Sequence, residues 1–341
     1  MKQAVMTSPG QIEFRDVPVP VPNADEVLIR MKRIGVCGSD IHVYHGKHAL
    51  TPYPVVQGHE VSGVIEKVGG AVRGLAPGDI VTVQPQVTCG TCYPCTHGAY
   101  HICDNLKVMG FQTTGAGSEF FAVAAGKVLK LPARMNLEHG AMIEPVAVAV
   151  HALGRSGDVT GKKVLVLGAG PIGNLVAQAA KGMGAAEVMI TDVSAFRLDK
   201  AKECGIDRCI DTSKTDLAAA ITEHFRAAKA DLILECVGSP TPIAQAVAVA
   251  RKGTDIIVVG VFGDKPTVDM GTVQDRELRL IGTLMYQEAD WRKAIDLVEK
   301  GKVRLQSLIT DHFAFADYTK AYEHIETHRE RAMKVMIVVE T

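Results

Sequence analysis

The stretch Gly168-Ala169-Gly170-Pro171-Ile172-Gly173 directly follows the apolar run Lys163–Leu167 and opens a segment with helical periodicity. In a strand–turn–helix unit of this kind, Gly168 allows a tight turn and Gly170 lets the backbone approach a pyrophosphate. Gly173 lets the helix pack closely on the strand, and the phosphates lie at the positive helix end. The stretch predicts the first unit of a dinucleotide-binding domain, and the alternative is a purely structural turn.

An acidic residue follows the glycines at the distance that such a unit requires. Asp192 directly follows the next predicted strand, Glu187–Thr191, about 20 residues further along the chain. Its carboxylate would accept hydrogen bonds from the adenosine ribose and repel a 2′-phosphate, which favours NAD over NADP. Arg197 is the competing feature, because its guanidinium could instead bind a 2′-phosphate.

Continuous apolar runs alternate with helical patterns through this part of the chain. The predicted strands are Lys163–Leu167, Glu187–Thr191, Arg208–Asp211, Asp231–Cys236, Asp255–Gly260 and Leu278–Leu284. The predicted helices are Gly173–Met183, Ala195–Cys204, Asp216–Lys229 and Thr241–Arg251. Apolar strands separated by helices indicate a parallel sheet covered on both faces. We therefore expect an α/β fold with a doubly wound, six-stranded Rossmann domain over residues 151–286.

The remainder of the chain has a different pattern of apolar and turn-forming residues. Residues 1–135 are β-rich and irregular, with short strand-like runs interrupted by Gly and Pro. After Tyr286 the mixed pattern resumes, with a helix at Asp290–Lys300 and strand-like ends at Leu308–Phe313 and Lys334–Val339. We expect residues 1–150 and 287–341 to form one β-rich domain, shaped as a partial barrel.

Composition excludes several classes of partner. A formal net charge of −1 over 341 residues argues against broad attraction to nucleic acid or to an anionic membrane. No run of about 18 apolar residues occurs, and the N-terminal segment lacks an apolar core of signal-peptide length. These features predict a cytoplasmic protein.

Four of the eight cysteines crowd one short segment. Cys89, Cys92, Cys95 and Cys103 are separated by Gly and Pro, which let a backbone wrap a single ion. Four thiolates make a closed tetrahedral shell without an open position for substrate, so the site they predict is structural. A nucleic-acid-binding zinc ribbon is disfavoured by the lack of basic residues around it, and four unrelated free thiols are improbable at this density.

A second group of polar residues interrupts the first domain. Gly58-His59-Glu60 offers an imidazole and a carboxylate, and the remaining thiol, Cys37, lies beside Ser39, Asp40 and His42. These side chains can hold a borderline-soft cation such as zinc. The alternative is a turn with ordinary polar residues.

Glu144 is a further anomaly, because it interrupts an apolar run, Ala141–Val150. A buried unpaired carboxylate is very costly, and a metal or a metal-bound water would compensate its charge. The alternative is a helix N-cap before Pro145, although glutamate is not a preferred cap.

Together these motifs carry a family resemblance along nearly the whole chain. They are Cys37-Gly38-Ser39-Asp40-Ile41-His42, Gly58-His59-Glu60-x-x-Gly63, the four-cysteine lobe, Ile143-Glu144-Pro145, the 168–173 glycine turn and Asp192-Val193-Ser194-Ala195-Phe196-Arg197-Leu198. The chain resembles the zinc-dependent medium-chain alcohol and polyol dehydrogenases, and most closely the sorbitol dehydrogenase branch. The resemblance implies a GroES-like catalytic domain beside the Rossmann domain, and a homodimer or homotetramer.

The resemblance also implies roles for individual residues. Cys37, His59 and Glu60 would bind a catalytic zinc, with Glu144 as a direct ligand or as the holder of the zinc-bound water. Asp40 would orient His59. Zinc would act as a Lewis acid that stabilises an alkoxide, and Ser39 would pass the proton through the cofactor ribose towards His42. Hydride would then pass from the substrate to the nicotinamide of NAD.

Two further segments are implied to contact the cofactor: Val259-Gly260-Val261 and Leu284-Met285-Tyr286. The second departs from the sorbitol pattern, because sorbitol dehydrogenases carry an arginine where this chain has Met285. Sorbitol itself is therefore in doubt, and related polyols, sugars, sugar acids and amino alcohols stay open as substrates.

Three other functions compete with this interpretation. Threonine 3-dehydrogenase-type chemistry on an amino alcohol is the nearest. A metallohydrolase is disfavoured because position 63 is Gly, so no His-Glu-x-x-His helix exists. A zinc-stabilised binding module would leave the glycine turn unexplained.

Overall fold

The computed structural model describes residues 1–340; Thr341, the last residue of the expected β-rich domain, lies outside them. The chain forms two compact units, Met1–Glu144 with Ile309–Thr341, and Pro145–Leu308. The sequence had placed the boundaries at 150/151 and 286/287. No helix in the described part of the chain is long and apolar enough to cross a membrane.

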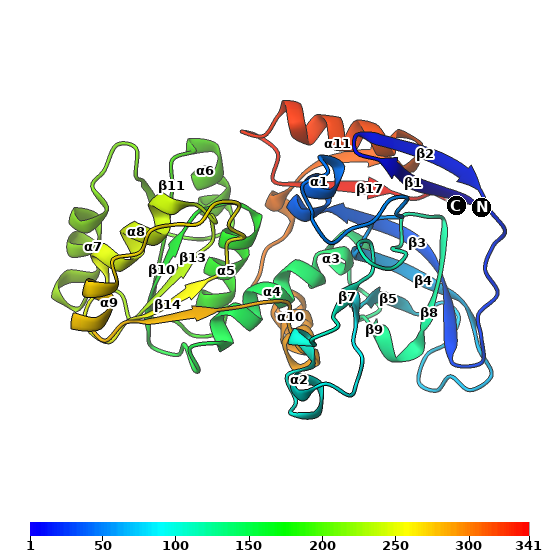
Figure 1. Ribbon diagram of the computed structural model, residues 1–341, viewed down its shortest axis with the longest axis horizontal. Helices are drawn as coiled ribbons and strands as arrows, with labels where there is room; N and C mark the ends of the chain where they lie inside the picture. The colour runs from blue at the N-terminus through cyan, green and yellow to red at the C-terminus, as the bar shows by residue number, and fades with distance from the viewer. Residues whose placement is uncertain (341) are drawn as a thin grey trace. The chain divides into compact units, whose positions relative to one another are not determined.

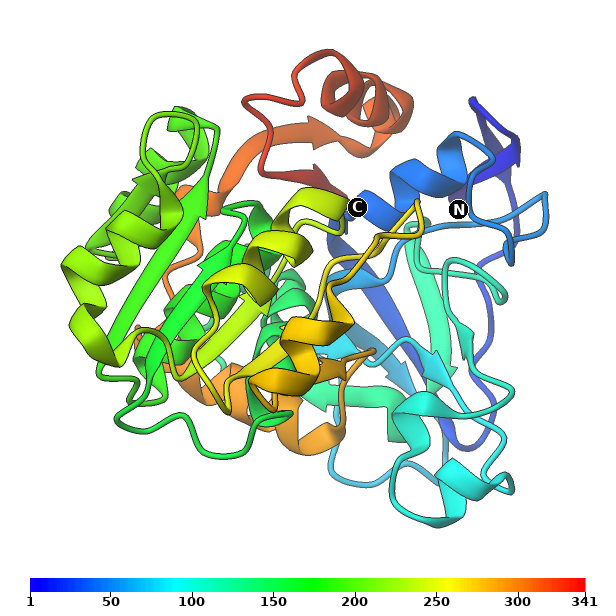
Figure 2. The same ribbon diagram turned by 60° about the vertical axis from the view of Figure 1, so that its left-hand side comes forward.

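The second unit is built on a six-stranded parallel sheet in the order β12-β11-β10-β13-β14-β15. Its strands are β10 (Lys163–Leu167), β11 (Glu187–Asp192), β12 (Arg208–Asp211), β13 (Leu232–Glu235), β14 (Asp255–Val258) and β15 (Arg279–Gly282). Its helices are α5 (Pro171–Gly182), α6 (Ala195–Glu203), α7 (Leu217–Phe225), α8 (Pro240–Val249), α9 (Met270–Asp275) and α10 (Glu288–Glu299), with short 3₁₀ turns η3 (Arg226–Ala228) and η4 (Gln306–Leu308). The helices cover both faces of the sheet, as Figures 1 and 2 show. The predicted doubly wound Rossmann fold is confirmed.

Continuous apolar strands explain this arrangement. Val164, Leu165 and Val166 of β10 are fully buried. Successive side chains of a strand point to opposite faces of the sheet, and helices cover both faces. On one face, Leu165 and Ile233 pack in a single core with side chains of α7 and α8.

The boundary after Tyr286 was misplaced, because residues 287–308 pack on the second unit. The ring of Trp291 in α10 is fully buried, with its centroid 5.3 Å from that of Tyr286. Further along, the backbone N–H of Arg304 donates to Gln178 Oε1 at 2.6 Å, and Gln178 Nε2 donates back to Arg304 O at 3.1 Å. This segment therefore belongs to the cofactor-type unit, and the chain returns to the first unit only at Ile309.

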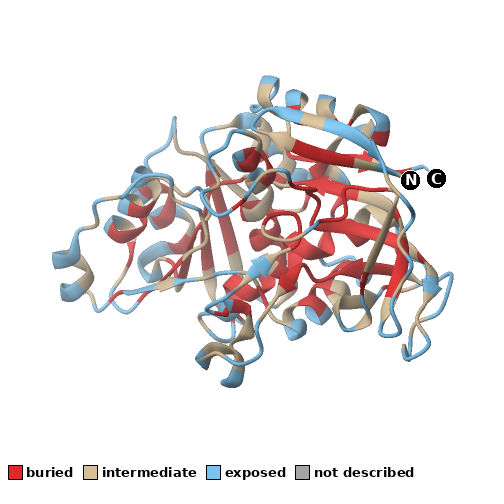
Figure 3. Cartoon of the chain, turned by 45° about the vertical axis from the view of Figure 1, so that its right-hand side comes forward, coloured by how far each residue is buried: buried red, intermediate tan, exposed pale blue. Residues whose placement is uncertain are grey.

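The first unit contains a seven-stranded sheet, β16-β17-β3-β4-β5-β9 with β8 paired to β3. Its strands are β1 (Lys2–Ser8), β2 (Gln11–Asp16), β3 (Glu26–Val36), β4 (Glu60–Val68), β5 (Ile80–Val83), β6 (Gln86–Val87), β7 (Lys107–Val108), β8 (Phe120–Ala124), β9 (Val128–Lys130), β16 (Ile309–Ala314) and β17 (Lys334–Val338). Its helices are α1 (Gly38–Tyr44), α2 (Tyr93–Thr96), α3 (Leu137–Ala141) and α11 (Tyr318–Thr327), with 3₁₀ turns η1 (Tyr100–Ile102), η2 (Ala125–Lys127) and η5 (Phe315–Asp317); α4 (Ile143–Gly154) begins here and continues into the second unit. The buried residues of this unit gather along its long strands, which Figure 3 shows in red.

Candidate metal centres and cofactor site

Three adjacent strands bring the first group of polar residues together. β3 lies between β17 and β4, with Val36 opposite Val335 on one side and Gly35 opposite Glu60 on the other. Cys37 therefore emerges from β3 between Lys334, at the start of β17, and His59, just before β4. A Cβ on Gly35 would lie 2.5 Å from Glu60 Oε2, so a larger residue there would displace the Glu60 carboxylate from its present position.

The ligand atoms of Cys37, His59 and Glu60 lie within 4.8 Å of one another. His59 and Glu60 are buried, and Cys37 is partly exposed. A thiol, an imidazole and a carboxylate are a donor set that suits zinc. Sequence spacing alone could not fix this proximity, but the β3–β4 register does.

Asp40 supports His59 from behind. Its Oδ1 lies 3.4 Å from His59 Nδ1, which has no well-formed hydrogen bond. Burial disfavours the charged form of His59, but Asp40 and Cys37 outweigh that effect and hold the pKa of the imidazole well above its ordinary value. A pocket this negative also favours a metal cation, which fits the donor set.

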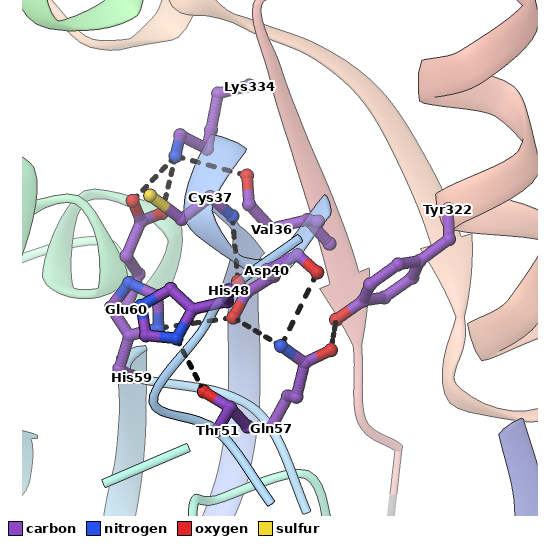
Figure 4. Close-up of polar contacts among 10 residues, drawn as sticks. All are labelled: Val36, Cys37, Asp40, His48, Thr51, Gln57, His59, Glu60, Tyr322 and Lys334. Carbon is purple, nitrogen blue, oxygen red and sulfur yellow. Dashed lines mark hydrogen bonds and ion pairs between the residues drawn. The ribbon is translucent and has the colours of Figure 1, made fainter. Parts of the chain in front are cut away.

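Lys334 is one of the residues that sequence reasoning missed. Its Nζ lies 2.7 Å from Glu60 Oε1 and 2.5 Å from Oε2, and it donates to Val36 O at 3.2 Å. Figure 4 shows it above Cys37 and Glu60. Burial opposes its charge, but Glu60 and Cys37 together raise its pKa. The available signal in the sequence was a lysine at the start of an apolar strand. A lysine buried at such a position needs a partner of opposite charge.

Glu144 lies near this group but not within it. It is 5% exposed and sits in the first turn of α4 rather than at a helix cap. Its charge contributes to the raised pKa of Lys334, so the two groups are electrostatically close. Among residues 1–340, the set of mutually close ligand atoms contains Cys37, His59 and Glu60 without Glu144.

Ser39 and His42 lie one turn apart on α1, which Cys37 caps. Ser39 is partly buried, whereas His42 is exposed. Residues three apart lie on the same side of a helix, so a path from the interior to solvent along α1 is geometrically reasonable.

The four predicted structural cysteines also come together. Cys89 Sγ lies 3.5 Å and Cys92 Sγ lies 3.7 Å from Cys103 Sγ, and Cys95 belongs to the same group. Tetrahedral zinc with bonds of about 2.3 Å places its sulfur ligands about 3.8 Å apart, so the geometry fits.

The ionisation of these thiols points to the same conclusion. Backbone N–H groups of Thr91 and Cys92 lower the pKa of Cys89 to about 5. Burial and the neighbouring thiols raise the pKa of Cys95 to about 12. Adjacent thiols cannot all ionise without a compensating cation, which a structural metal would supply.

In the second unit, each glycine of the turn at 168–173 has a distinct environment. Gly168 has φ +99°, and a Cβ on Gly173 would lie 1.9 Å from Gly168 O. Gly170 caps α5, with Pro171 and Ile172 following, but a Cβ on Gly170 would meet nothing within 4 Å. Packing requires Gly168 and Gly173, whereas the space beside Gly170 is free for a ligand at the helix N-terminus.

Asp192 holds the same turn. Its Oδ2 accepts from Ala169 N–H at 2.7 Å, and its Oδ1 accepts from the N–H groups of Val193 and Ser194 at 2.8 and 2.9 Å. A carboxylate has about four acceptor positions, so room remains for a ribose hydroxyl. Arg197 Nη1 lies 3.9 Å from Asp192 Oδ2, and its Nε is buried without a partner in the structure.

Exposed apolar side chains line the carboxyl ends of the parallel strands. Val193 follows β11, Val237 follows β13, Val261 lies beyond β14 and Leu284 beyond β15, with exposures of 69, 49, 84 and 53%. Ligands bind at this edge of doubly wound sheets, and exposed apolar groups there suit flat rings. Val237 had not been singled out from the sequence and Val193 was named only within the 192–198 motif, although their positions after apolar strands were the available signal.

The loops after the last two strands differ in accessibility. The backbone N–H groups of Val259 and Gly260 donate to Glu235 O at 2.8 and 2.9 Å, which fixes that loop against β13. Tyr286 is fully buried, and Met285 has φ +53°. Thus Val261 and Leu284, rather than Tyr286, present exposed side chains.

A doubly wound dinucleotide-type unit and a thiol–imidazole–carboxylate group in one chain define the class of two-domain, metal-dependent dehydrogenases. The zinc-binding dehydrogenase family model matches residues 171–300, and the alcohol dehydrogenase GroES-like domain model matches residues 23–133. The chain therefore belongs to the zinc-dependent medium-chain alcohol and polyol dehydrogenase family, and it is an oxidoreductase.

Individual relatives match over nearly the full length. The 2-dehydro-3-deoxy-L-galactonate 5-dehydrogenase of Pseudoalteromonas atlantica is 35% identical, over 93% of this chain and 92% of that one. Sorbitol dehydrogenase of Ovis aries is 36% identical, over 98% and 95%. Among solved structures, an alcohol dehydrogenase of Escherichia coli CFT073 complexed with NADH has a TM-score of 0.92 at 33% identity, covering 99% of each chain. A zinc-binding dehydrogenase of Sinorhizobium meliloti bound to NADP has a TM-score of 0.91 at 29% identity, covering 99% and 98%.

Proposed function

We propose that this protein oxidises a secondary alcohol of a polyol, sugar or sugar acid and transfers the hydride to NAD. The observation that carries the proposal is the proximity of Cys37, His59 and Glu60, within 4.8 Å, in a chain that also has a dinucleotide-type sheet. Zinc held by these residues would lower the pKa of an alcohol hydroxyl. The relatives that act on sorbitol and on a sugar acid support the substrate class.

Ser39 and His42 are proposed as the proton path. Ser39 would accept the hydroxyl proton from the substrate and pass it through the cofactor ribose to His42, which would release it to solvent. The partly buried position of Ser39 and the exposed position of His42 on one side of α1 support this direction. The four cysteines at positions 89, 92, 95 and 103 are proposed to hold a second, structural zinc.

The proposal has a direct test. The zinc-loaded protein is incubated with NAD and a panel of polyols, sugar acids and L-threonine, and the absorbance of reduced nicotinamide is followed. We expect turnover with at least one polyol or sugar derivative. Turnover with L-threonine alone would instead support an amino-alcohol dehydrogenase, and no turnover with any alcohol would refute the proposal.

Cofactor preference is proposed to rest on Asp192. Asp192→Ala is expected to lower the NAD to NADP ratio of kcat/KM by about tenfold to a hundredfold, because a charged hydrogen bond to the ribose is lost. Asp192→Asn is the matched variant, since it keeps an acceptor for the turn while removing the charge. An unaltered ratio in both variants would show that Arg197 or a neighbour determines the choice.

Glu144 is proposed to act on the catalytic zinc or its water rather than on the fold alone. Glu144→Ala is expected to keep the four-cysteine zinc while losing about tenfold to a hundredfold in turnover, the range found when groups around a metal are removed. Metal analysis and steady-state kinetics check this. Unchanged turnover would remove Glu144 from the site.

A homodimer or homotetramer is also part of the proposal. β15 is the last strand of the parallel sheet, and its residues are mostly exposed, so its outer edge can pair with a second copy. Light scattering on the purified protein tests this, and a monomer at micromolar concentration would contradict it. The cysteines are unpaired, which suits a reducing compartment such as the cytoplasm.

A further inference from the structure

The amide of Gln57 lies between the residue that supports His59 and a helix near the C-terminus. Gln57 Nε2 donates to Asp40 Oδ1 at 3.1 Å, and Tyr322 Oη donates to Gln57 Oε1 at 3.1 Å. Gln57 and Tyr322 are 2% and 1% exposed, so water does not compete for either bond. Figure 4 shows Asp40, Gln57 and Tyr322 joined in sequence by dashed lines, to the right of His59.

The two hydrogen bonds of Gln57, to Asp40 and from Tyr322, allow a single orientation of its amide. Asp40 as a carboxylate only accepts hydrogen bonds, so the NH₂ end of Gln57 must face it. The carbonyl end then faces Tyr322, whose hydroxyl supplies the proton. Turning the amide would place its oxygen against a carboxylate and its NH₂ against a donor.

Asp40 is consequently held from two directions. The backbone N–H of Cys37 donates to Oδ2 at 2.9 Å, which caps α1, while Gln57 donates to Oδ1. Oδ1 is also the atom that faces His59 Nδ1. Without Gln57, the carboxylate would keep only the bond to Cys37 and could rotate away from the imidazole.

Packing against neighbouring rings holds Tyr322 at the end of this hydrogen-bonded chain of Asp40, Gln57 and Tyr322. Its ring stacks on Tyr318 at 5.6 Å between centroids with a 23° interplanar angle, and Tyr44 packs against it at 5.4 Å. Tyrosine has only two side-chain torsions, and both are fixed by this packing. α11 thereby contacts Gln57, which lies 265 residues earlier in the chain than Tyr322.

We propose that Gln57 and Tyr322 are positioning residues that hold Asp40 against His59 and thereby fix the imidazole for the metal. A histidine that ligates metal through one nitrogen is oriented by the partner of the other, and loss of such partners typically weakens metal binding about tenfold to a hundredfold. The role rests on the proposed zinc site at Cys37, His59 and Glu60. It is distinct from the ion pair of Lys334 with Glu60, which acts on another ligand.

The test is the rate at which a chelator removes zinc from the loaded protein. The wild type is expected to show two phases, and the His59→Ala variant identifies the phase of the Cys37–His59–Glu60 group because it lacks that phase. Tyr322→Phe and Gln57→Leu are each expected to accelerate this phase about tenfold and to leave the four-cysteine phase unchanged. Because Tyr322 acts through Gln57, the double variant is expected to be no faster than the faster single variant.

Tyr44→Phe is the matched control, since it removes a hydroxyl from a ring that packs on Tyr322 at 5.4 Å between centroids and leaves the Gln57 amide untouched. Release within twofold of the wild type is expected for it. An unchanged rate in Tyr322→Phe, equal acceleration in Tyr44→Phe, or additive effects in the double variant would each overturn the positioning role. A wild type that releases zinc from the four-cysteine group alone would refute the proposed zinc site instead, so the two failures are distinguishable.

Discussion

Replacement of His59 by alanine is expected to remove the metal from the Cys37–His59–Glu60 group and to lower kcat/KM by about a thousandfold or more. Metal ions contribute several kcal/mol to stabilising developing charge on oxygen, and each 1.36 kcal/mol is a factor of about ten in rate. The four-cysteine group belongs to a separate set of ligands, so its zinc should stay bound. Metal content per chain and steady-state kinetics measure both effects.

His48→Ala is the control for this variant. Phe111 contacts both imidazoles, with centroids 5.0 Å from His48 and 5.1 Å from His59, so either substitution opens space against the same ring. His48 donates to or accepts from Thr51 and lies outside the group of mutually close ligand atoms. We expect His48→Ala to keep both metals. Equal metal loss in the two variants would attribute the effect to packing, and full metal retention in His59→Ala would remove His59 from the ligand set.

The parallel sheet could be predicted because its signal is local. Each strand is a short apolar run bounded by turn residues, and the glycine turn adds a motif whose spacing has a steric cause at Gly168 and Gly173. The segment 287–308 was misassigned because an amphipathic helix such as α10 carries no information on which sheet it covers. Contacts between residues distant in sequence, such as those of Arg304 with Gln178, decide that question, and they exist only in the folded chain.

The candidate metal ligands and the residues around them were predictable to a different extent. Cys37 and His59 were recognised through short motifs, and the β3–β4 register shows why residues about twenty apart can meet. Lys334 and Tyr322 were not recognised, because they come from β17 and α11, far along the chain. Gln57 was overlooked because a lone glutamine before a glycine has no pattern of its own. Such partners are specified by strand order and helix docking, which a local motif does not encode.

Lys334→Met is expected to destabilise the metal-free protein strongly and the zinc-loaded protein much less. Lys334 and Glu60 are 3% and 1% exposed, so removing the ammonium leaves a buried carboxylate without its counter-charge. Breaking a buried ion pair in this way costs about 3–5 kcal/mol. Zinc at Cys37 and His59 would replace the lost positive charge, because Glu60 would then be free to turn towards the metal.

Thermal unfolding with and without chelator measures this difference. The unfolding midpoint of the metal-free variant should lie about 10 °C below that of the metal-free wild type. Addition of zinc should raise the midpoint of the variant by more than it raises the midpoint of the wild type. Lys334→Arg keeps the charge and should behave like the wild type. The double variant Glu60→Gln with Lys334→Met removes both charges and should regain most of the metal-free stability. An equal loss with and without zinc would show that the ion pair stabilises the sheet without any coupling to the metal, and Glu60 would then be a structural partner of Lys334 rather than a ligand.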